Sequence, residues 1–225
     1  MSRYINSMRL FLGSRFWLKP LVSLGIVAGI IIVSAVISEF APPDNDFLAG
    51  FVTGIMAMCS TMMPIVGVVY LMTLYSAVHR ETPGFKFFSS VPDARGQFKR
   101  AVITSNVLVI LQGTVLIVVF YLIDRQPWTL LLSITVLLII TGIMNFSGIF
   151  RKQMTRLVLN TCQLVLIGFL EGLISSVEQD EKELFTSMIT EHTWMAPLML
   201  SVSAAVYAAG LAISLVGCGR KWGDD

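Results

Sequence analysis

The sequence predicts an all-α polytopic membrane protein with six transmembrane helices. Of the 225 residues, 55% are hydrophobic and only 13% are charged, whereas about a quarter of the residues in soluble domains are charged. The mean hydropathy is +0.78, and the apolar residues gather in runs near the ~20 residues that a helix needs to cross a bilayer. A water-soluble fold could not bury this much apolar surface, so we expect one transmembrane domain over residues 1–225.

Six stretches are long and apolar enough to be spans. They cover residues 21–38, 47–74, 101–123, 128–150, 157–174 and 196–216. The second is longer than a bilayer requires, and Pro64 within it predicts a tilt or a kink. The connections are short, except for residues 76–100 and 175–195.

The first 18 residues are predicted to form a helix that lies in the membrane interface. Its apolar side would carry Tyr4, Ile5, Met8, Phe11, Leu12 and Phe16, and its polar side Arg3, Asn6, Ser7, Arg9, Gly13 and Ser14. Such a helix places its apolar face in the bilayer and its bases on anionic headgroups. Trp17 and Lys19 suit interface anchors, and Pro20 suits a bend into the first span. The alternative is a frayed basic tail.

The distribution of bases predicts the orientation. With the N-terminus in the cytoplasm, all 16 Lys and Arg residues except Arg125 and Lys182 fall on the inner side. Cytoplasmic loops of membrane proteins carry such an excess of bases. The pattern therefore predicts six crossings with both termini in the cytoplasm.

The outer segment 175–195 is predicted to contain a short amphipathic helix before the last span. Its apolar face would carry Val177, Leu184, Phe185, Met188 and Ile189. Its early turns hold the acids Glu178, Asp180, Glu181 and Glu183, where the helix dipole favours negative charge. A solvated acidic loop is the alternative.

The sequence does not predict a catalytic site or a metal site. The two histidines, His79 and His192, fall on opposite sides of the membrane in this topology. Neither an HExxH pattern nor a phosphate-binding GxxxxGK[ST] loop is present. Cys59, Cys162 and Cys218 are widely spaced and lack a metal-binding or disulfide pattern. We expect no catalytic residue, no metal and no cofactor on this chain.

A few residues within the spans are candidates for a substrate path. Glu171 is the one acid inside a predicted span, and intramembrane acids are functional candidates, although it lies close enough to the outer interface to reach it. Methionines next to Pro64 would form an adaptable apolar wall, or simply pack in the core. The predicted path consists of Met56, Met62, Met63, Gln112 and Glu171.

Polar residues inside spans more often serve helix packing than substrate contact. The polar set comprises Asn106, Gln112, Thr114, Asn145, Asn160 and Gln163.

The long cytoplasmic loop 76–100 carries the strongest pattern. Its aromatic knob would comprise Phe85, Phe87, Phe88 and Val91, followed by Pro92. Asp93 is placed to cap a short helix from Ala94, whose side chains Arg95, Lys99 and Arg100 are basic. An element that is aromatic on one flank and basic on the other suits a groove in a soluble partner. The alternative is an ordinary basic loop on anionic lipid.

The order of these elements resembles that of ABC-2-type transporter permeases. The loop text FKFFSSVPDARGQFKRAVITSNVL is similar to that family's F-x-S-L-P-[IV]-[ST]-R region, with Ser90, Val91, Pro92 and Arg95 at matching positions. The text departs from the pattern at Asp93-Ala94, and Gly96 weakens the helix. The minimal loops look most like compact permeases that export antimicrobial or cytolytic peptides, such as the phenol-soluble modulin exporters, and related immunity transporters.

The resemblance implies a coupling helix that inserts into a separately encoded ATP-binding subunit, where ATP and Mg would bind. It also implies a transmembrane dimer, formed with a second copy or a sister permease, in a bacterial cell membrane and without a nucleic-acid partner. The residues expected to dock the ATPase are Phe87, Phe88, Val91, Pro92, Arg95 and Phe98.

The function expected from these observations is export of amphipathic peptides or lipid-like molecules. A non-transporting membrane regulator, immunity or scaffold protein that holds a partner through the same loop is the alternative. A small intramembrane enzyme, a third possibility, would require Glu171 for turnover.

Overall fold

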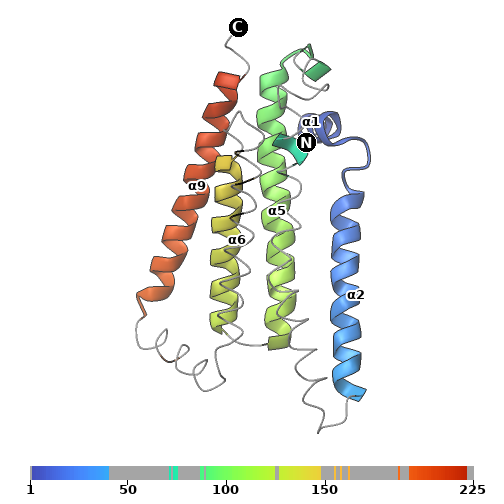
Figure 1. Ribbon diagram of the computed structural model, residues 1–225, viewed down its shortest axis with the longest axis vertical. Helices are drawn as coiled ribbons and strands as arrows, with labels where there is room; N and C mark the ends of the chain where they lie inside the picture. The colour runs from blue at the N-terminus through green and yellow to red at the C-terminus, as the bar shows by residue number, and fades with distance from the viewer. Residues whose placement is uncertain are drawn as a thin grey trace.

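The computed structural model describes residues 2–40, 71, 73–75, 87, 88, 90–124, 127–147, 155, 158, 162, 187 and 193–221. Within this part of the chain the regular elements are all helices. The long helices are α2 (Leu18–Phe40), α5 (Ala94–Asp124), α6 (Pro127–Ser147) and α9 (Met195–Lys221), and a short helix, α1 (Ser2–Leu12), precedes them. Figure 1 shows the long helices side by side, with α1 next to α5 near one end, which we call the α1 end.

Three of the described helices are long and apolar enough to cross a membrane. These segments are Ala94–Val119, Leu130–Ser147 and Met195–Gly217, and they correspond to the predicted spans 101–123, 128–150 and 196–216. Helix α2 covers the predicted span 21–38 but lies outside this group of three. The prediction of an all-helical membrane protein is thus confirmed, whereas the count of six remains a prediction. Most of 47–74, 157–174 and 175–195 lies outside the described residues.

The exposed surfaces of the long helices are strongly apolar. Large side chains that are at least half exposed include Leu21, Ile26, Ile32, Val107, Leu111, Leu122, Leu198 and Val216. Soluble proteins rarely leave apolar patches of this extent in water. The acyl chains of a bilayer are the solvent in which these surfaces are stable.

The turn between α1 and α2 lies earlier than the sequence predicts. Helix α1 ends at Leu12 rather than near residue 18, and Gly13 follows with a φ of 87°. The Gly13 N–H donates to the Arg9 carbonyl at 3.0 Å, which satisfies one of the last carbonyls of α1. Pro20 lies inside the first turn of α2, where proline is tolerated. The chain therefore bends at Gly13 and not at Pro20.

The Gly13→Ala substitution is expected to lower the free energy of unfolding by about 1–2 kcal/mol, because a Cβ is strained in the left-handed backbone region. Unfolding of the purified chain in mixed detergent micelles measures the change. Gly25→Ala in α2 is the matched control, because a Cβ at Gly25 meets no atom within 4 Å. Equal losses in the two variants would contradict the conformational explanation.

The sequence predicts that the apolar face of α1 lies on lipid, but in the structure this face packs on protein. Met8 and Phe11 are buried, and the Ser105 hydroxyl of α5 donates to the Met8 sulfur at 3.3 Å. Ser7, predicted on the polar side, is also buried, and its hydroxyl donates to the Arg3 carbonyl at 2.9 Å. Periodicity indicates a helix but does not say which surface covers it. Helix α1 is a packed helix and not a frayed tail.

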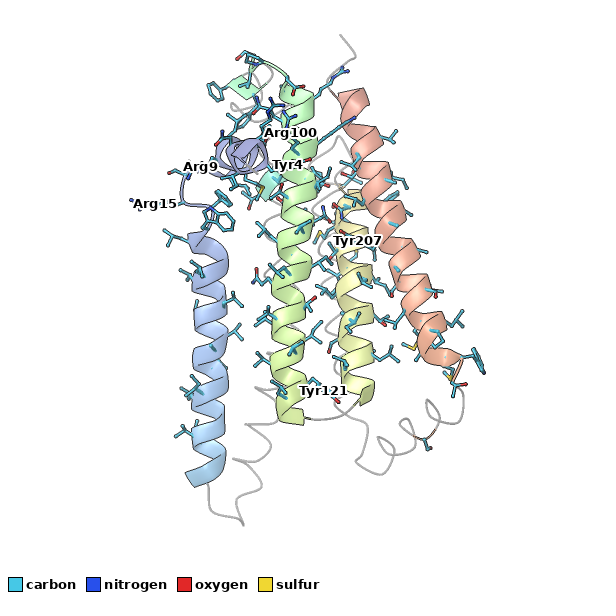
Figure 2. The ribbon with its side chains drawn as sticks, turned by 180° about the vertical axis from the view of Figure 1, so that it is seen from behind. Tyr4, Arg9, Arg15, Arg100, Tyr121 and Tyr207 are labelled. Atoms are coloured by element: carbon cyan, nitrogen blue, oxygen red, sulfur yellow. The ribbon has the colours of Figure 1, made fainter. Side chains whose placement is uncertain are left out.

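The bases of α1 and the following turn remain at the surface. Arg3, Arg9 and Arg15 are exposed, and Figure 2 shows Arg9 and Arg15 on the outer side of α1 and its turn, away from α5. Trp17 in the same turn is 42% exposed. The expected contact of these bases with anionic headgroups remains a prediction.

Helices α6 and α9 pack backbone against backbone at a glycine pair. Both run toward the α1 end (Figure 1), and Gly142 of α6 meets Gly210 of α9. A Cβ on Gly142 would lie 2.8 Å from the Val206 carbonyl oxygen, and a Cβ on Gly210 would overlap the Gly142 carbonyl. We call this contact the α6–α9 seam. It brings α9 closer to α6 than larger side chains would permit.

Candidate docking site

The knob of the cytoplasmic loop is a compact turn at the α1 end of the bundle, just before α5 (Figure 1). We define the knob as the described residues from Phe87 to Arg95. The backbone N–H and the hydroxyl of Ser90 both donate to the Phe87 carbonyl, at 3.2 and 2.7 Å. The Val91 N–H donates to the Phe88 carbonyl at 3.3 Å. These local bonds fix the shape of the knob without help from a partner.

Asp93 lies within the knob, directly before the first residue of α5. Its φ is 53°, and its carbonyl accepts the Gln97 N–H at 2.9 Å as the first bond of the helix. Its carboxylate accepts a bond from the Arg100 guanidinium at 2.7 Å. The carboxylate lies over Gly96, where an added Cβ would be 2.7 Å from the Asp93 Cγ. Gly96, which looks like a weak point in the sequence, makes room for this carboxylate.

The helix that begins at Ala94 is not a short separate element. It begins where the sequence predicts but continues without a break to Asp124, over 31 residues. The sequence divides into a basic segment and an apolar segment, yet neither a proline nor a left-handed residue separates them, so the helix continues. The knob is therefore joined rigidly to a membrane-spanning helix.

The predicted docking residues divide into a surface group and an inner group. Phe87 is 61% exposed, and Pro92 and Arg95 are exposed as well. Phe88 and Val91 are partly buried. Phe98 is 1% exposed, so we move it from the docking surface to the packing beneath it. The sequence places Phe98 among bases but does not show whether its side chain lies on the exposed or the buried side of the helix.

An unbroken series of aromatic rings runs from the knob into the bundle. The ring centroids of Phe87 and Phe88 are 5.5 Å apart, those of Phe88 and Phe11 are 5.0 Å apart, and those of Phe11 and Phe98 are 5.4 Å apart. Tyr75 follows at 6.1 Å from Phe98, edge to face. These spacings are those of favourable aromatic pairs. We call these five residues the aromatic column.

The inner end of the column is a buried group of hydrogen-bonded side chains. The Tyr75 hydroxyl lies 2.9 Å from Asn145 Oδ1 and 2.6 Å from Ser214 Oγ. Asn145 and Asn106 form a reciprocal amide pair, with bonds of 2.6 and 3.0 Å. We call Tyr75, Asn106, Asn145 and Ser214 the polar cluster. It joins residues 73–75, α5, α6 and α9, and all four side chains are at most 2% exposed.

The polar cluster has a single consistent arrangement of donors. The second amide hydrogens of Asn106 and Asn145 bond the Val102 and Thr141 carbonyls, both at 2.9 Å. Asn145 Oδ1 can only accept, so the Tyr75 hydroxyl must donate to it. Ser214 then donates to the Tyr75 oxygen. Every amide hydrogen of the pair is used, which is what a buried polar group requires.

The predicted substrate path is described at one position only. Gln112 is 7% exposed on α5, next to Gly113, against which the Leu137 side chain of α6 packs. Met56, Met62, Met63 and Glu171 lie outside the described residues. Among the described residues, no group of three His, Cys, Asp or Glu side chains could hold a metal ion.

Comparison of the chain with protein-family models, with curated proteins and with solved structures gives no match. The resemblance to ABC-2-type permeases therefore remains a prediction from the sequence. The knob, the aromatic column and the polar cluster are the structural observations that bear on function.

Sequence reasoning identified only part of this arrangement. The general expectation that polar residues in spans serve helix packing is confirmed for Asn106 and Asn145. Tyr75, Ser214 and the role of Phe11 were missed. Tyr75 lies 139 positions from Ser214 and 70 from Asn145, and Phe11 lies 77 positions from Phe88. No spacing pattern along one helix predicts contacts between residues so far apart in the sequence.

Proposed function

We propose that this chain is the transmembrane permease subunit of an ATP-driven ABC exporter, with a separately encoded ATPase docked on the knob. One observation carries the proposal. The exposed ring of Phe87 is the outer end of an aromatic column that reaches the interior of the bundle. A partner that binds the knob therefore touches the outer end of a series of ring contacts that reaches Phe98 on the membrane-spanning helix α5.

The chemistry of the knob fits a groove with an apolar floor and an acidic rim. Phe87 and Pro92 present apolar surface, and Arg95 presents a base beside them. The one described acid of the knob, Asp93, is paired with Arg100. Its charge is thereby neutralised, and the knob offers a partner aromatic area and positive charge. Exposed aromatic and arginine side chains are the commonest anchors of protein interfaces.

The continuity of α5 supplies a route from the knob to the far side of the membrane. The helix of 31 residues is about 46 Å long at 1.5 Å per residue. Figure 2 shows Arg100 near its start and Tyr121 near its opposite end. Movement of the knob therefore tilts or shifts a whole spanning helix, which is a common way for a domain closure to change the packing of helices.

The proposal retains the finer expectations from the sequence. The cargo would be amphipathic peptides or lipid-like molecules, and the chain would pair with a second copy or a sister permease. Six spans with cytoplasmic termini, in a bacterial cell membrane, place the knob where a cytosolic ATPase can reach it.

Co-purification tests the proposal. The tagged chain, extracted in mild detergent from its own cells, is expected to retain an ABC ATPase. Phe87→Ala combined with Arg95→Glu should weaken that association by ~30-fold or more, because loss of a central anchor costs about 2 kcal/mol or more. Arg9→Glu on α1 is the matched control, since it inverts an exposed base that is not part of the knob.

Two outcomes would overturn the proposal: no ATPase accompanies the wild-type chain, or the knob variant retains it unchanged. Recovery of a partner that is not an ATPase, through the same knob, would favour the non-transporting regulator or scaffold.

A further inference from the structure

The polar cluster contains two kinds of connection that differ in how they are held. Asn106 and Asn145 bond each other twice and also bond carbonyls of their own helices. The Tyr75 hydroxyl is held differently, at the tip of a ring that packs on Phe98. Through this single oxygen, residues 73–75 are bonded to both α6 and α9.

The Tyr75 ring turns displacement of the column into loss of hydrogen bonds. An aromatic ring is rigid, so a shift of Phe98 that moves the Tyr75 ring also moves its hydroxyl. Hydrogen bonds weaken steeply beyond about 3.2 Å, and those of Tyr75 measure 2.9 and 2.6 Å. A displacement of about 1 Å away from both partners takes both distances beyond this range.

The α6–α9 seam determines which part of α9 such a break would release. Gly210 is fixed against Gly142 by backbone contact, and Ser214 lies one turn further toward the α1 end. Without the bond to Tyr75, the end of α9 beyond Gly210 loses a buried tie to the bundle, while the seam and the amide pair hold α5, α6 and α9 together. The contact of Gly142 with Gly210 would then act as the pivot, and the bond of Tyr75 to Ser214 as the point at which the end of α9 is released.

We propose that Tyr75 is a latch: a positioning residue whose hydroxyl ties the end of α9 to the bundle until movement of the knob, passed along the aromatic column, withdraws it. The inference deepens the proposed function, which supplies the force on the knob. The latch itself is a property of this chain and can be tested without the ATPase.

Hydrogen–deuterium exchange of the full chain in lipid nanodiscs tests the latch. Tyr75→Phe keeps the ring and removes the hydroxyl, so backbone amides of α9 around Ser214 should exchange about threefold faster, the effect of one average interhelical hydrogen bond. Phe88→Ala removes the ring that joins Phe87 to Phe11 in the column. It should also raise exchange in the same segment of α9, even though Phe88 lies in the knob and not on α9.

The double variant distinguishes a latch from general loosening. If the column acts on α9 through the Tyr75 hydroxyl, Phe88→Ala adds nothing once Tyr75→Phe is present. Trp17→Ala is the matched control, because it removes an aromatic side chain at the same end of the bundle but outside the column, and it should leave α9 unchanged. Additive effects in the double variant, no response of α9 to Phe88→Ala, or an equal response to Trp17→Ala would each overturn the latch.

The exchange result and the co-purification result separate the two proposals. A non-additive double variant in a chain that retains no ATPase would support the latch and reject the exporter. An ATPase that binds the knob, together with additive exchange effects, would support the exporter and reject the latch.

Discussion

The Gly210→Ala variant is expected to lose about 1–3 kcal/mol of unfolding free energy, the usual cost of forcing an extra carbon into a close-packed contact. A Cβ at Gly210 would overlap the Gly142 carbonyl, and the group in its way is backbone rather than a flexible side chain. Helices α6 and α9 must therefore move apart over the whole seam. Unfolding in mixed detergent micelles measures the loss.

Gly29→Ala in α2 is the matched control for the seam. Gly29 is also a glycine within a long apolar helix, but a Cβ there meets no atom within 4 Å. Since alanine is a better helix former than glycine by up to ~1 kcal/mol, the control should be neutral or more stable. If Gly210→Ala were as stable as Gly29→Ala, the close approach of α6 and α9 would be wrong.

Asn145→Leu should cost about 2 kcal/mol of unfolding free energy. The Asn145 side chain makes three interhelical bonds, one with Tyr75 and two with Asn106, and such bonds average about 0.6 kcal/mol each within membranes. Leucine has a similar size, so the loss reports hydrogen bonding rather than a cavity. The same unfolding assay measures it.

Two further variants test this explanation. Ser203→Ala removes a hydroxyl that is as deeply buried but bonds only its own helix, at the Leu200 carbonyl, and it should cost much less than Asn145→Leu. Replacing both Asn106 and Asn145 by leucine should cost less than the sum of the single changes, because neither amide then leaves the other unpaired. A fully additive double variant would show that the amide pair is not coupled.

Part of the candidate site follows from local sequence. Asp93 after a proline predicts a helix that starts at Ala94, and the structure starts α5 there. The contrast between Phe87 and Phe98 shows the limit of such reasoning. Both are phenylalanines of one basic, aromatic stretch, yet one is 61% exposed and the other 1%, because α1 and Tyr75 cover Phe98 and leave Phe87 open.

Helix α1 shows the same limit in another form. The spacing of its apolar residues predicts a helix, and the helix is present. The same spacing does not predict what covers the apolar face, because that face is equally stable on lipid and on an equally apolar helix. The buried contacts of Met8 with Ser105 and of Phe11 with Phe98 decided the matter.

The order of residues is enough to predict a helical membrane protein, because apolar runs of bilayer length are stable only in a bilayer. It also determined where α5 begins and which loop carries an aromatic, basic knob, because turns and caps depend on neighbouring residues. The packing of the helices was needed to show that the knob lies at the end of an aromatic column that reaches Tyr75. It was also needed to show that Tyr75 meets Asn106, Asn145 and Ser214 in one polar cluster. Those contacts join residues up to 139 positions apart, and such pairings are fixed by how the helices pack, not by the order of residues within any one of them.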